Sequence, residues 1–482
     1  MVCVLRIALT YIGRTSLSGY QQAWLMRLCP YWLPPMTCRH CHAPLTTPFL
    51  DLGHAPLSNA YLSEADLRAP ESYYPLRTRV CTHCWLVQTE DYAAPDAMFD
   101  DDYAYFSSTS STWLNHAARY AAMITDRLAL TEDDFVLEVA CNDGYLLRNF
   151  REAGIPCLGV EPTACTAEAA RKQGIPVVSD FFGVELATEL AATYPKADLI
   201  AANNVLAHVP DINDFCAGLR IALAPGGTVT LEFQHLMTLI QHGQFDTVYH
   251  EHFSYLSLYA VQHVLAAADL RVWDVERLPT HGGSLRVYAC HANDPRSTTD
   301  AVAALLDEEM KRGLQEPDTY ATFQGRADRI KDNLIRFLIE AKRSGKTVAA
   351  YGAAAKGNTL LNYAGIKPDL LPFVCDAAPS KQGKYLPGSH LPIRPPEALQ
   401  QDPPDYVLIL PWNIAPEIVK QQHDLAAQGT RFVVAVPALT ILDTHTAPPS
   451  VTPSPLLQRH PVVAVDALFN RQRHEGAGDG IL

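Results

Sequence analysis

The sequence predicts an α/β protein with a central Rossmann-like sheet, a small cysteine module before it and a second, smaller α/β domain after it. Two Cys-x-x-Cys pairs stand early in the chain, at residues 38–41 and 81–84. Two series of short apolar runs then alternate with helical stretches, which is typical of mostly parallel sheets covered on both faces by helices. A charged, amphipathic stretch at 299–344 separates the two series and indicates a helical connector.

Composition places the chain among ordinary globular enzymes. Its 482 residues are too many for one core, and 48% hydrophobic with 19% charged residues is typical of a folded protein. The 52 acidic residues outnumber the 38 Lys and Arg residues, giving a net charge of −14. This balance argues against a general nucleic-acid or anionic-membrane surface. The sequence has no apolar run of roughly 18 residues, so it predicts no membrane span. We therefore expect neither nucleic acid nor membrane as a partner.

Residues 1–36 show no periodic pattern. The apolar opening, Met1 to Leu9, is a poor signal peptide because no clean small-residue cleavage site follows it. Met36 stands immediately before the first cysteine pair. We expect Met36 to be the functional start and 1–36 to be a non-native or disordered extension.

Residues 37–100 are predicted to be a zinc-binding module. Each Cys-x-x-Cys pair is short enough to place both sulfurs on one knuckle, and four thiolates satisfy tetrahedral Zn²⁺ at about 2.3 Å per bond. The predicted ligands are Cys38, Cys41, Cys81 and Cys84. With four positions filled, none remains for substrate or water, so the zinc is expected to be structural. Alternative ligands are His40, His42 and His83, and two disulfides or a redox dithiol are alternative interpretations.

Most other cysteines stand alone within apolar runs. They include Cys141, Cys157, Cys216, Cys290 and Cys375. Isolated cysteines of this kind usually behave as small buried hydrophobes in a reducing compartment. We therefore expect a cytoplasmic protein.

The first turn of the central domain, predicted at 101–298, favours one nucleotide cofactor over another. The apolar run Val136–Val139 leads into an acidic, small-residue turn that carries Asp143 and a single glycine, Gly144, before a helix at 145–153. A dinucleotide site wants Gly-x-Gly-x-x-Gly, and carboxylates here would repel a pyrophosphate. S-adenosylmethionine has no phosphate and carries a sulfonium and an ammonium group, so acidic neighbours favour it. Glu161, after the next run, can accept both ribose hydroxyls.

The remaining predicted cofactor contacts lie further along the chain. Asp180 could accept the adenine amine and Phe181 could stack on the ring, although core packing is the alternative for Phe181 and Phe182. Asn203 and His208 follow a later apolar run, where open α/β sheets bind ligands, and a satisfied loop histidine is the alternative for His208. The full predicted set is Glu138, Asn142, Asp143, Gly144, Glu161, Asp180, Phe181 and Asn203.

Residues 245–255 combine two histidines, a carboxylate and two phenols in eleven positions. Because histidine titrates near neutral pH, Tyr249-His250-Glu251-His252 can supply a base, an orienting carboxylate and proton donors together. A polar loop or a metal cluster is the alternative. Downstream, His281 precedes two glycines that could bring backbone close to a ligand, with a tight turn before a strand as the alternative.

The second α/β domain is predicted at 346–443, after a helical connector at 299–345 and before a flexible Pro-, Ser- and Thr-rich tail at 444–482. Its first run ends in a small-residue turn, Gly352 to Lys356, that leads into a helix. Small residues let backbone amides approach a phosphate, and Lys356 adds positive charge. Helix–strand packing is the alternative interpretation of such a turn.

Taken in order, these motifs resemble a known family. The paired cysteines, Glu-x-x-x-Asn-Asp-Gly, Asn-Asn-Val-Leu-Ala-His-Val-Pro-Asp, Tyr-His-Glu-His-Phe-Ser-Tyr, His-Gly-Gly-Ser at 281–284 and Lys-Gly-Asn at 356–358 are similar to those of three-part sugar C-methyltransferases. These enzymes act on nucleotide-linked 4-keto-deoxysugars. The resemblance covers about residues 37 to 440. It implies a zinc-binding first domain, a Rossmann-like methyltransferase sheet, and a last domain that helps to hold the nucleotide-sugar.

The resemblance also implies site roles. His252 is the implied general base, with Tyr249 and Glu251 beside it and His208 and Tyr103 lining the site. The implied substrate contacts are His250, His281, Lys356 and Asn358.

One residue departs from the family pattern. Family members usually have Gly where Ala140 stands, and the alanine is tolerated if its φ is below zero.

The expected function is S-adenosylmethionine-dependent C-methylation of a nucleotide-linked 4-keto-deoxysugar. A proton next to the ketone is removed, and the resulting carbanion takes the methyl group. The rival interpretations are an NAD-linked nucleotide-sugar oxidoreductase and a catalytically inactive, methyltransferase-like binding protein. A nucleic-acid methyltransferase is disfavoured by the acidic balance.

Overall fold

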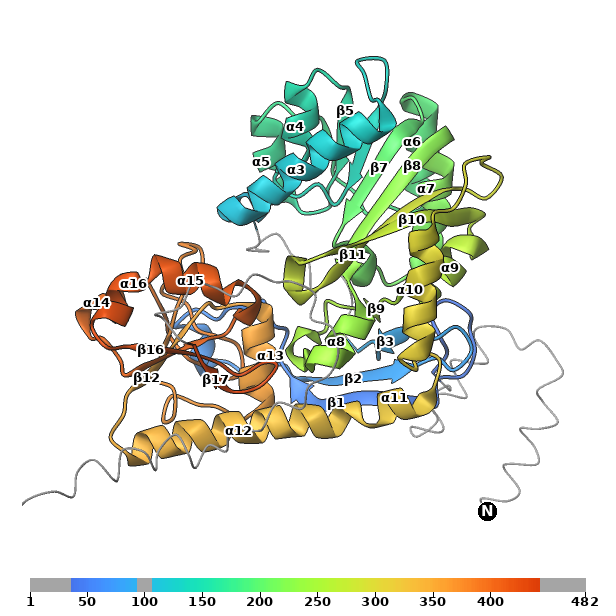
Figure 1. The fold of residues 1–482 in the computed structure, drawn as a ribbon. Coiled ribbons are helices and arrows are strands. Elements are labelled where there is room, and N and C mark those ends of the chain that lie inside the picture. The colour runs from blue at the N-terminus through green and yellow to red at the C-terminus, as the bar shows by residue number, and fades with distance from the viewer. Residues whose placement is uncertain (1–35, 93–105, 443–482) are drawn as a thin grey trace, which may run out of the picture. The chain divides into compact units, whose positions relative to one another are not determined.

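The structure is a computed structural model that describes residues 36–92 and 106–442. The chain divides into two compact units, Met1–Thr37 and Cys38–Leu482, and the following description concerns the second. Tyr103, the predicted tail at 444–482 and all of the predicted extension except Met36 lie outside the described residues. In the described part of the chain, the strands gather into three sheets (Figure 1).

The central sheet has seven strands in the order β10-β11-β8-β7-β4-β5-β6. These strands are β4 (Val136–Val139), β5 (Cys157–Val160), β6 (Val177–Val178), β7 (Ala197–Asn203), β8 (Leu223–Gln234), β10 (Leu270–Leu278) and β11 (Ser284–His291). From β6 to β8 the strands are parallel, whereas β11 runs antiparallel to both of its neighbours. The predicted mostly parallel Rossmann-like sheet is confirmed.

Alternate residues of the central strands face two different helical layers. Leu137 and Ile200 pack in one cluster with α6, α7 and α9, whereas Val136 and Leu199 pack in another with α3 and α4. The helices of this domain are α3 (Ser111–Leu128), α4 (Leu147–Glu152), α5 (Ala164–Lys172), α6 (Val184–Thr193), α7 (Ile212–Ala222), α8 (Leu236–His242) and α9 (Leu258–Ala267). Because both faces are covered, polar groups that bind ligands are left to the edge where the strands end.

The cysteine module forms a four-stranded antiparallel sheet in the order β1-β2-β3-β9. Three strands come from the module itself: β1 (Thr47–Ala55), β2 (Tyr74–Val80) and β3 (Val87–Thr89). The fourth, β9 (Ser254–Tyr255), belongs to the histidine-rich segment, and its Tyr255 pairs with Val87. No sequence pattern predicts that a strand from the central domain completes the module sheet.

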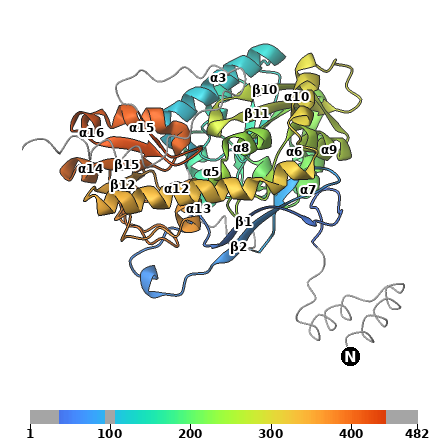
Figure 2. The same ribbon diagram turned by 60° about the horizontal axis from the view of Figure 1, so that its bottom comes forward.

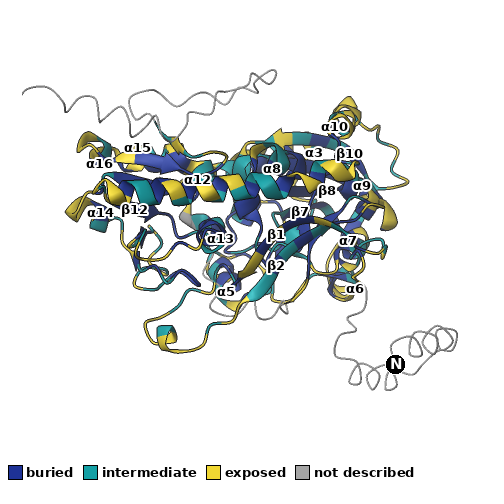
Figure 3. Cartoon of the chain, turned by 90° about the horizontal axis from the view of Figure 1, so that it is seen from below, coloured by how far each residue is buried: buried dark blue, intermediate teal, exposed yellow. Residues whose placement is uncertain are grey.

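The connector is helical, as its amphipathic pattern predicts. It contains α10 (Asp300–Lys311), α11 (Pro317–Ala321) and α12 (Phe323–Arg343). In α12, Phe323 stacks on Phe49 of the module, and Phe337 meets Tyr406 of the last domain edge to face. Figure 2 shows α12 running past β1, β2 and α13, and Figure 3 shows buried and exposed positions alternating along it. One amphipathic helix therefore packs against both the first and the last domain.

The last domain is a six-stranded sheet in the order β14-β13-β12-β15-β16-β17, parallel except for β17. Its elements are β12 (Val348–Tyr351), α13 (Ala355–Tyr363), β13 (Val374–Cys375), β14 (Ile393–Arg394), α14 (Glu397–Gln401), β15 (Tyr406–Ile409), α15 (Ala415–Gln421), α16 (His423–Ala427), β16 (Arg431–Val434) and β17 (Thr440–Ile441). The apolar run 370–375 yields only the two-residue β13, because Pro372 cannot donate to a strand ladder.

Two further expectations concern chemistry of the chain as a whole. The ten cysteines within the described ranges are all free, and the isolated apolar ones are buried, as predicted. Among the described helices, none combines the length and apolarity that crossing a bilayer requires.

Candidate functional site

The four predicted zinc ligands converge. Cys38 and Cys84 have their Sγ atoms 3.5 Å apart, as do Cys41 and Cys81, and all four Sγ atoms lie within 4.8 Å of one another. A tetrahedron with Zn–S bonds of about 2.3 Å has S–S edges of about 3.8 Å, so the spacing of these thiolates is close to that of a tetrahedral zinc site.

Groups around the cysteine cluster support the same assignment. The Gln88 side-chain amide donates to Cys38 Sγ at 3.2 Å, a contact typical of the shell around a metal-bound thiolate. His40 instead uses Nδ1 to contact Asn213 Oδ1 at 2.7 Å, at the start of α7. No histidine joins the metal-type cluster in the described part of the chain. The alternative histidine ligands are therefore not needed.

The turn after β4 has a strongly constrained backbone. Ala140, Asn142 and Gly144 all have positive φ, at 58°, 51° and 80°. Ala140 is therefore not accommodated by a negative φ, and the condition stated for tolerating it is not met. A Cβ in the left-handed region crowds the following carbonyl oxygen, which costs about 1–2 kcal/mol. At Gly144 a Cβ would lie 2.4 Å from Ile175 Cδ1, so glycine is required there.

Three carboxylates surround this turn. Glu161 is tied to the backbone, because its two oxygens accept the N–H groups of Asn142 at 2.9 Å and Thr163 at 3.0 Å. Glu138 is only 1% exposed, and neither of its oxygens has a hydrogen-bond partner in the structure. Burial, followed by the charges of Glu161 and Asp143, raises the pKa of Glu138 well above its ordinary value. A cationic ligand would relieve this accumulation of buried acid groups.

Other predicted cofactor contacts lie on the same edge of the sheet. Asp143 accepts Ser108 N at 3.0 Å through Oδ2, while its buried Oδ1 has no partner. Asn203 ends β7 with a buried, unpartnered Oδ1. Phe181 is 53% exposed beside the exposed Asp180, so core packing does not explain it; Phe182 instead packs on Phe215. Orphaned acceptors and a free aromatic ring fit S-adenosylmethionine, which offers amine, hydroxyl and adenine groups.

His252 is held by the backbone of its own segment. Its Nδ1 lies 2.9 Å from the carbonyl oxygen of Thr247, in the short 3-10 helix η5 (Phe245–Thr247). A carbonyl only accepts, so Nδ1 carries the proton and Nε2 holds the lone pair. Burial, followed by the neighbouring His208, lowers the pKa of His252 well below its ordinary value. The imidazole is therefore neutral at neutral pH and presents a basic nitrogen.

Two predicted neighbours lie against this ring. Tyr249 lies with its ring centroid 4.0 Å from that of His252, and His208 meets it edge to face at 4.6 Å. His208 follows β7 in η4 (Leu206–His208) and donates from Nδ1 to the Glu251 carbonyl oxygen at 2.9 Å. Burial lowers the pKa of His208 to about 4. A neutral His208 thus offers Nε2 as an acceptor rather than as a donor.

The Glu251 carboxylate does not orient an imidazole, which was one predicted role. Both of its oxygens accept from the Asn59 side-chain amide, at 2.9 and 2.8 Å. Burial raises the pKa of Glu251 to about 7. Asn59 belongs to the cysteine module, so a module loop reaches the candidate catalytic segment.

Two predicted substrate contacts instead hold domains together. His250 is 4% exposed, contacts the Pro75 carbonyl through Nε2 at 3.2 Å and packs on Tyr74 of the module. Asn358 is 1% exposed and donates to the Ser58 carbonyl at 2.6 Å. These contacts favour a docking role for both side chains.

Lys356 and His281 lie near the histidine-rich segment. The Lys356 ammonium donates to Asn413 Oδ1 at 2.7 Å, and no carboxylate of a described residue pairs with it within salt-bridge distance. Burial lowers the pKa of Lys356, an effect partly offset by Asp246. His281 has φ 52°, meets Trp113 edge to face at 5.3 Å and keeps a buried Nε2 without a partner. Such strain and unmet hydrogen-bonding capacity are typical of ligand sites.

Three family models match successive parts of the chain. Residues 38–99 match a zinc binding domain, residues 113–275 a methyltransferase domain, and residues 279–437 a C-methyltransferase C-terminal domain. The C-methyltransferase NovU of Streptomyces niveus is 34% identical over 408 residues, which cover 85% of this chain and 97% of NovU. The chain belongs to this three-domain C-methyltransferase family.

As a C-methyltransferase of this family, the protein uses S-adenosylmethionine and carries a structural zinc ion. More distant similarity extends to the tRNA U34 carboxymethyltransferase of Pseudoalteromonas translucida, 27% identical over 198 residues that cover 39% of this chain and 57% of that enzyme. Among solved structures, a Burkholderia thailandensis 1,6-didemethyltoxoflavin N1-methyltransferase aligns with 18% identity and a TM-score of 0.33, covering 43% of this chain and 96% of its own. That TM-score is too low to support an argument.

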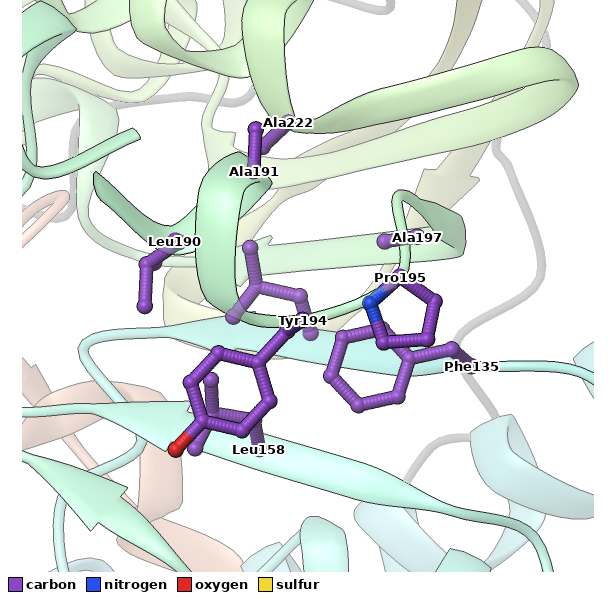
Figure 4. Close-up of a pocket in the computed structure, with 9 residues that line it drawn as sticks. Phe135, Leu158, Leu190, Ala191, Tyr194, Pro195, Ala197 and Ala222 are labelled. Carbon is purple, nitrogen blue, oxygen red and sulfur yellow. The ribbon is translucent and has the colours of Figure 1, made fainter. Parts of the chain in front are cut away.

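One apolar hollow of the C-methyltransferase is not part of this site. Figure 4 shows its lining: Phe135, Leu158, Leu190, Ala191, Tyr194, Pro195, Ala197 and Ala222, together with Leu137. Phe135 and Ala197 stand at the amino ends of β4 and β7, at the opposite edge from Ala140 and Asn203. Parallel sheets bind ligands where their strands end, so this hollow lies at the wrong edge of the sheet for the cofactor.

Two residues near the site, Trp412 and Asn59, were not predicted from the sequence. Trp412 follows β15 and donates its indole N–H to Asp246 at 2.7 Å, and its place at the end of a parallel strand was a usable signal. Asn59 gave no signal, because it lies in an irregular loop 192 positions from Glu251.

Proposed function

We propose that this C-methyltransferase methylates the carbon next to the ketone of a nucleotide-linked 4-keto-deoxysugar, with His252 as the general base. The observation that carries the proposal is the state of His252. Its imidazole is neutral, its Nδ1 is fixed on the Thr247 carbonyl, and no described residue hydrogen-bonds to Nε2. A base with that nitrogen free is suited to take a proton from a substrate carbon.

The ketone explains how such a weak base removes a proton from carbon. Charge from the broken C–H bond spreads onto the carbonyl oxygen, and hydrogen-bond donors stabilise that oxygen by several kcal/mol in a dry site. The hydroxyl of Tyr249, whose ring lies on His252, is the proposed donor. Tyr103 is a second proposed donor, although it lies outside the described residues. His208 is not proposed as a donor, because its one proton is committed to Glu251.

The acidic turn prepares the other reactant. When bound, S-adenosylmethionine supplies an electrophilic methyl group on a sulfonium. Glu138 and Asp143 place two carboxyl groups beside the turn, and Glu161 fixes the turn through Asn142 N. Held near His252, the two reactants meet in one orientation, and proximity of this kind is worth several kcal/mol.

The nucleotide part of the proposed substrate is supported by Lys356. Its half-buried side chain has a neutral partner, Asn413, instead of a carboxylate. A diphosphate would complete that charge, because ammonium and phosphate oxygen form strong charge-assisted hydrogen bonds. Lys381 lies in the same turn region but is already engaged with Asp376 and the Ala353 carbonyl.

The test is a methyl-transfer assay with labelled S-adenosylmethionine and a panel of 4-keto nucleotide sugars. We expect label in one sugar at a carbon next to the ketone, and the 4-hydroxy counterpart to remain unlabelled. Absence of transfer to any 4-keto sugar, with S-adenosylmethionine bound by calorimetry, would reject the substrate class. A signal with NAD in the same calorimetry would revive the oxidoreductase alternative.

A further inference from the structure

A tryptophan of the last domain reaches the catalytic segment. Trp412 begins η7 (Trp412–Ile414), shortly after the end of β15, and its Nε1 donates to Asp246 Oδ2 at 2.7 Å. Asp246 has 0% exposure, and its second oxygen has no partner in the structure. A buried carboxylate with a single hydrogen-bond partner depends strongly on that partner.

Asp246 is next to Thr247, whose carbonyl group holds the imidazole of His252. It is the middle residue of η5, and the next carbonyl, that of Thr247, accepts the Nδ1 proton of His252. A rotation of η5 would move this carbonyl and release the imidazole from the tautomer that leaves Nε2 basic. The indole of Trp412 therefore restrains the His252 ring through two successive residues.

The same indole also contacts two other parts of the site. Its six-membered ring packs so closely on the 280–282 turn that a Cβ at Gly282 would lie 2.4 Å from Cη2. The Lys356 ammonium lies 4.9 Å from the ring centroid, a cation–π distance, and Lys356 binds Asn413 next to the tryptophan. Trp412 thus contacts the segment of His252, the His281 turn and the Lys356 ammonium together.

We propose that Trp412 is a positioning residue that fixes the orientation and tautomer of His252 through Asp246 and Thr247. The last domain thereby contributes to the proton-removal step and not only to substrate binding. The assignment of His252 as the base rests on the proposed function, whereas the Trp412–Asp246 hydrogen bond does not.

The competing explanation is that Trp412 merely docks the last domain. A second contact holds the same segment, because Thr359 Oγ1 of α13 donates to the Val248 carbonyl at 3.0 Å. If docking strength alone mattered, Thr359→Val and Trp412→Phe would have similar kinetic effects. The positioning role predicts that only Trp412→Phe slows deprotonation.

The kinetic test compares Trp412→Phe with Trp273→Phe. Trp273 is buried and its Nε1 has no partner, so the control loses the same atoms without losing a hydrogen bond. We expect Trp412→Phe to lower kcat by about 10- to 100-fold, as a small misplacement of a catalytic group does. Exchange of the substrate proton into D₂O should slow by the same factor, while the Kd of S-adenosylmethionine stays unchanged. Unchanged exchange, or an equal loss in Trp273→Phe or Thr359→Val, would overturn the proposal.

A second test needs no substrate. With ¹⁵N-labelled tryptophan, the chain gives at most six indole N–H resonances, one for each Trp, and Trp412→Phe identifies that of Trp412. We expect this proton to be protected from solvent exchange, to stay protected in Asp246→Asn, which keeps an acceptor oxygen, and to lose protection in Asp246→Ala. If the indole proton stays protected in both variants, the hydrogen bond is refuted. If the bond is present but no 4-keto sugar is methylated, the proposed function fails instead.

Discussion

The turns that follow β4 and β12 share one backbone plan in two different domains. In each, the residue after the strand has positive φ, Ala140 at 58° and Gly352 at 91°. In each, a carboxylate at the end of the neighbouring strand accepts a turn N–H: Glu161 from Asn142, and Asp376 from Ala353 at 2.7 Å.

What differs is the charge added to that plan. The β4 turn has Glu138 and Asp143 in addition to its capping carboxylate, whereas the β12 turn has Lys356 and Lys381 near its own. One scaffold is therefore suited to a cationic ligand and the other to an anionic one. The comparison teaches that ligand class in such sheets is set by a few charges placed on a common turn.

Removing the proposed base, His252, should have the largest effect. We expect His252→Ala to lower kcat by about 10²–10⁴-fold, the usual contribution of a general base, with little change in the Kd of S-adenosylmethionine. His250→Ala is the matched control, because His250 contacts Pro75 and should affect stability rather than the chemical step. Steady-state rates and calorimetry check both, and wild-type turnover in His252→Ala would remove the assignment.

Neutralising the acidic turn should weaken cation binding. Glu138→Gln keeps the shape but removes the charge, and we expect the Kd of S-adenosylmethionine to rise by about 10- to 100-fold, with a smaller rise for S-adenosylhomocysteine, which has no sulfonium.

The same residue sets a pH dependence. Burial raises the pKa of Glu138, and a nearby cation lowers it again, so a cationic ligand releases a proton between the two pKa values and its affinity should increase with pH there. Calorimetry in buffers of different ionisation enthalpy measures the released proton. Release that persists in Glu138→Gln would contradict this origin.

Removing the positive charge of Lys356 in the β12 turn should weaken binding of an anionic ligand and leave binding of the cationic one unchanged. We expect Lys356→Met to weaken binding of a nucleoside diphosphate by about tenfold, a typical loss for one charge-assisted contact, and to leave S-adenosylmethionine binding unchanged. Lys420→Met, on the exposed surface of α15, is the control. Titrations with the nucleoside diphosphate at two salt concentrations check this prediction. An equal loss of affinity in both variants would indicate only a general effect of the net charge.

The smallest effect concerns the backbone plan itself. Replacing Ala140 with the glycine found at the equivalent position of the other turn should raise the free energy of unfolding by about 1 kcal/mol, because glycine adopts positive φ without strain. Urea unfolding gives the value. A loss of stability in Ala140→Gly would show that the alanine methyl contributes more through packing than it costs in strain.

The parts that could be predicted from sequence are those whose signals are local. The cysteine pairs, the strand–turn–helix at Glu138 to Gly144 and the alternating runs each lie within a few residues, and each was found. The contacts Asn59 to Glu251 and Trp412 to Asp246 join residues 192 and 166 positions apart and leave no periodic trace. His250 shows why residue type alone does not assign a role. It is a histidine in a motif typical of catalytic sites, but its ring faces the module.

The pairing of Tyr255 with Val87 has a consequence for how activity depends on metal supply. The sheet that grips the end of the histidine-rich segment is itself organised by the four thiolates, since Gln88 of β3 both pairs with Ser254 and contacts Cys38. Removing the zinc ion should therefore loosen the imidazole of His252, which is not one of the zinc ligands. Chelator titrations should show methyl transfer and zinc content declining together, so that cellular zinc availability would govern how many copies are competent.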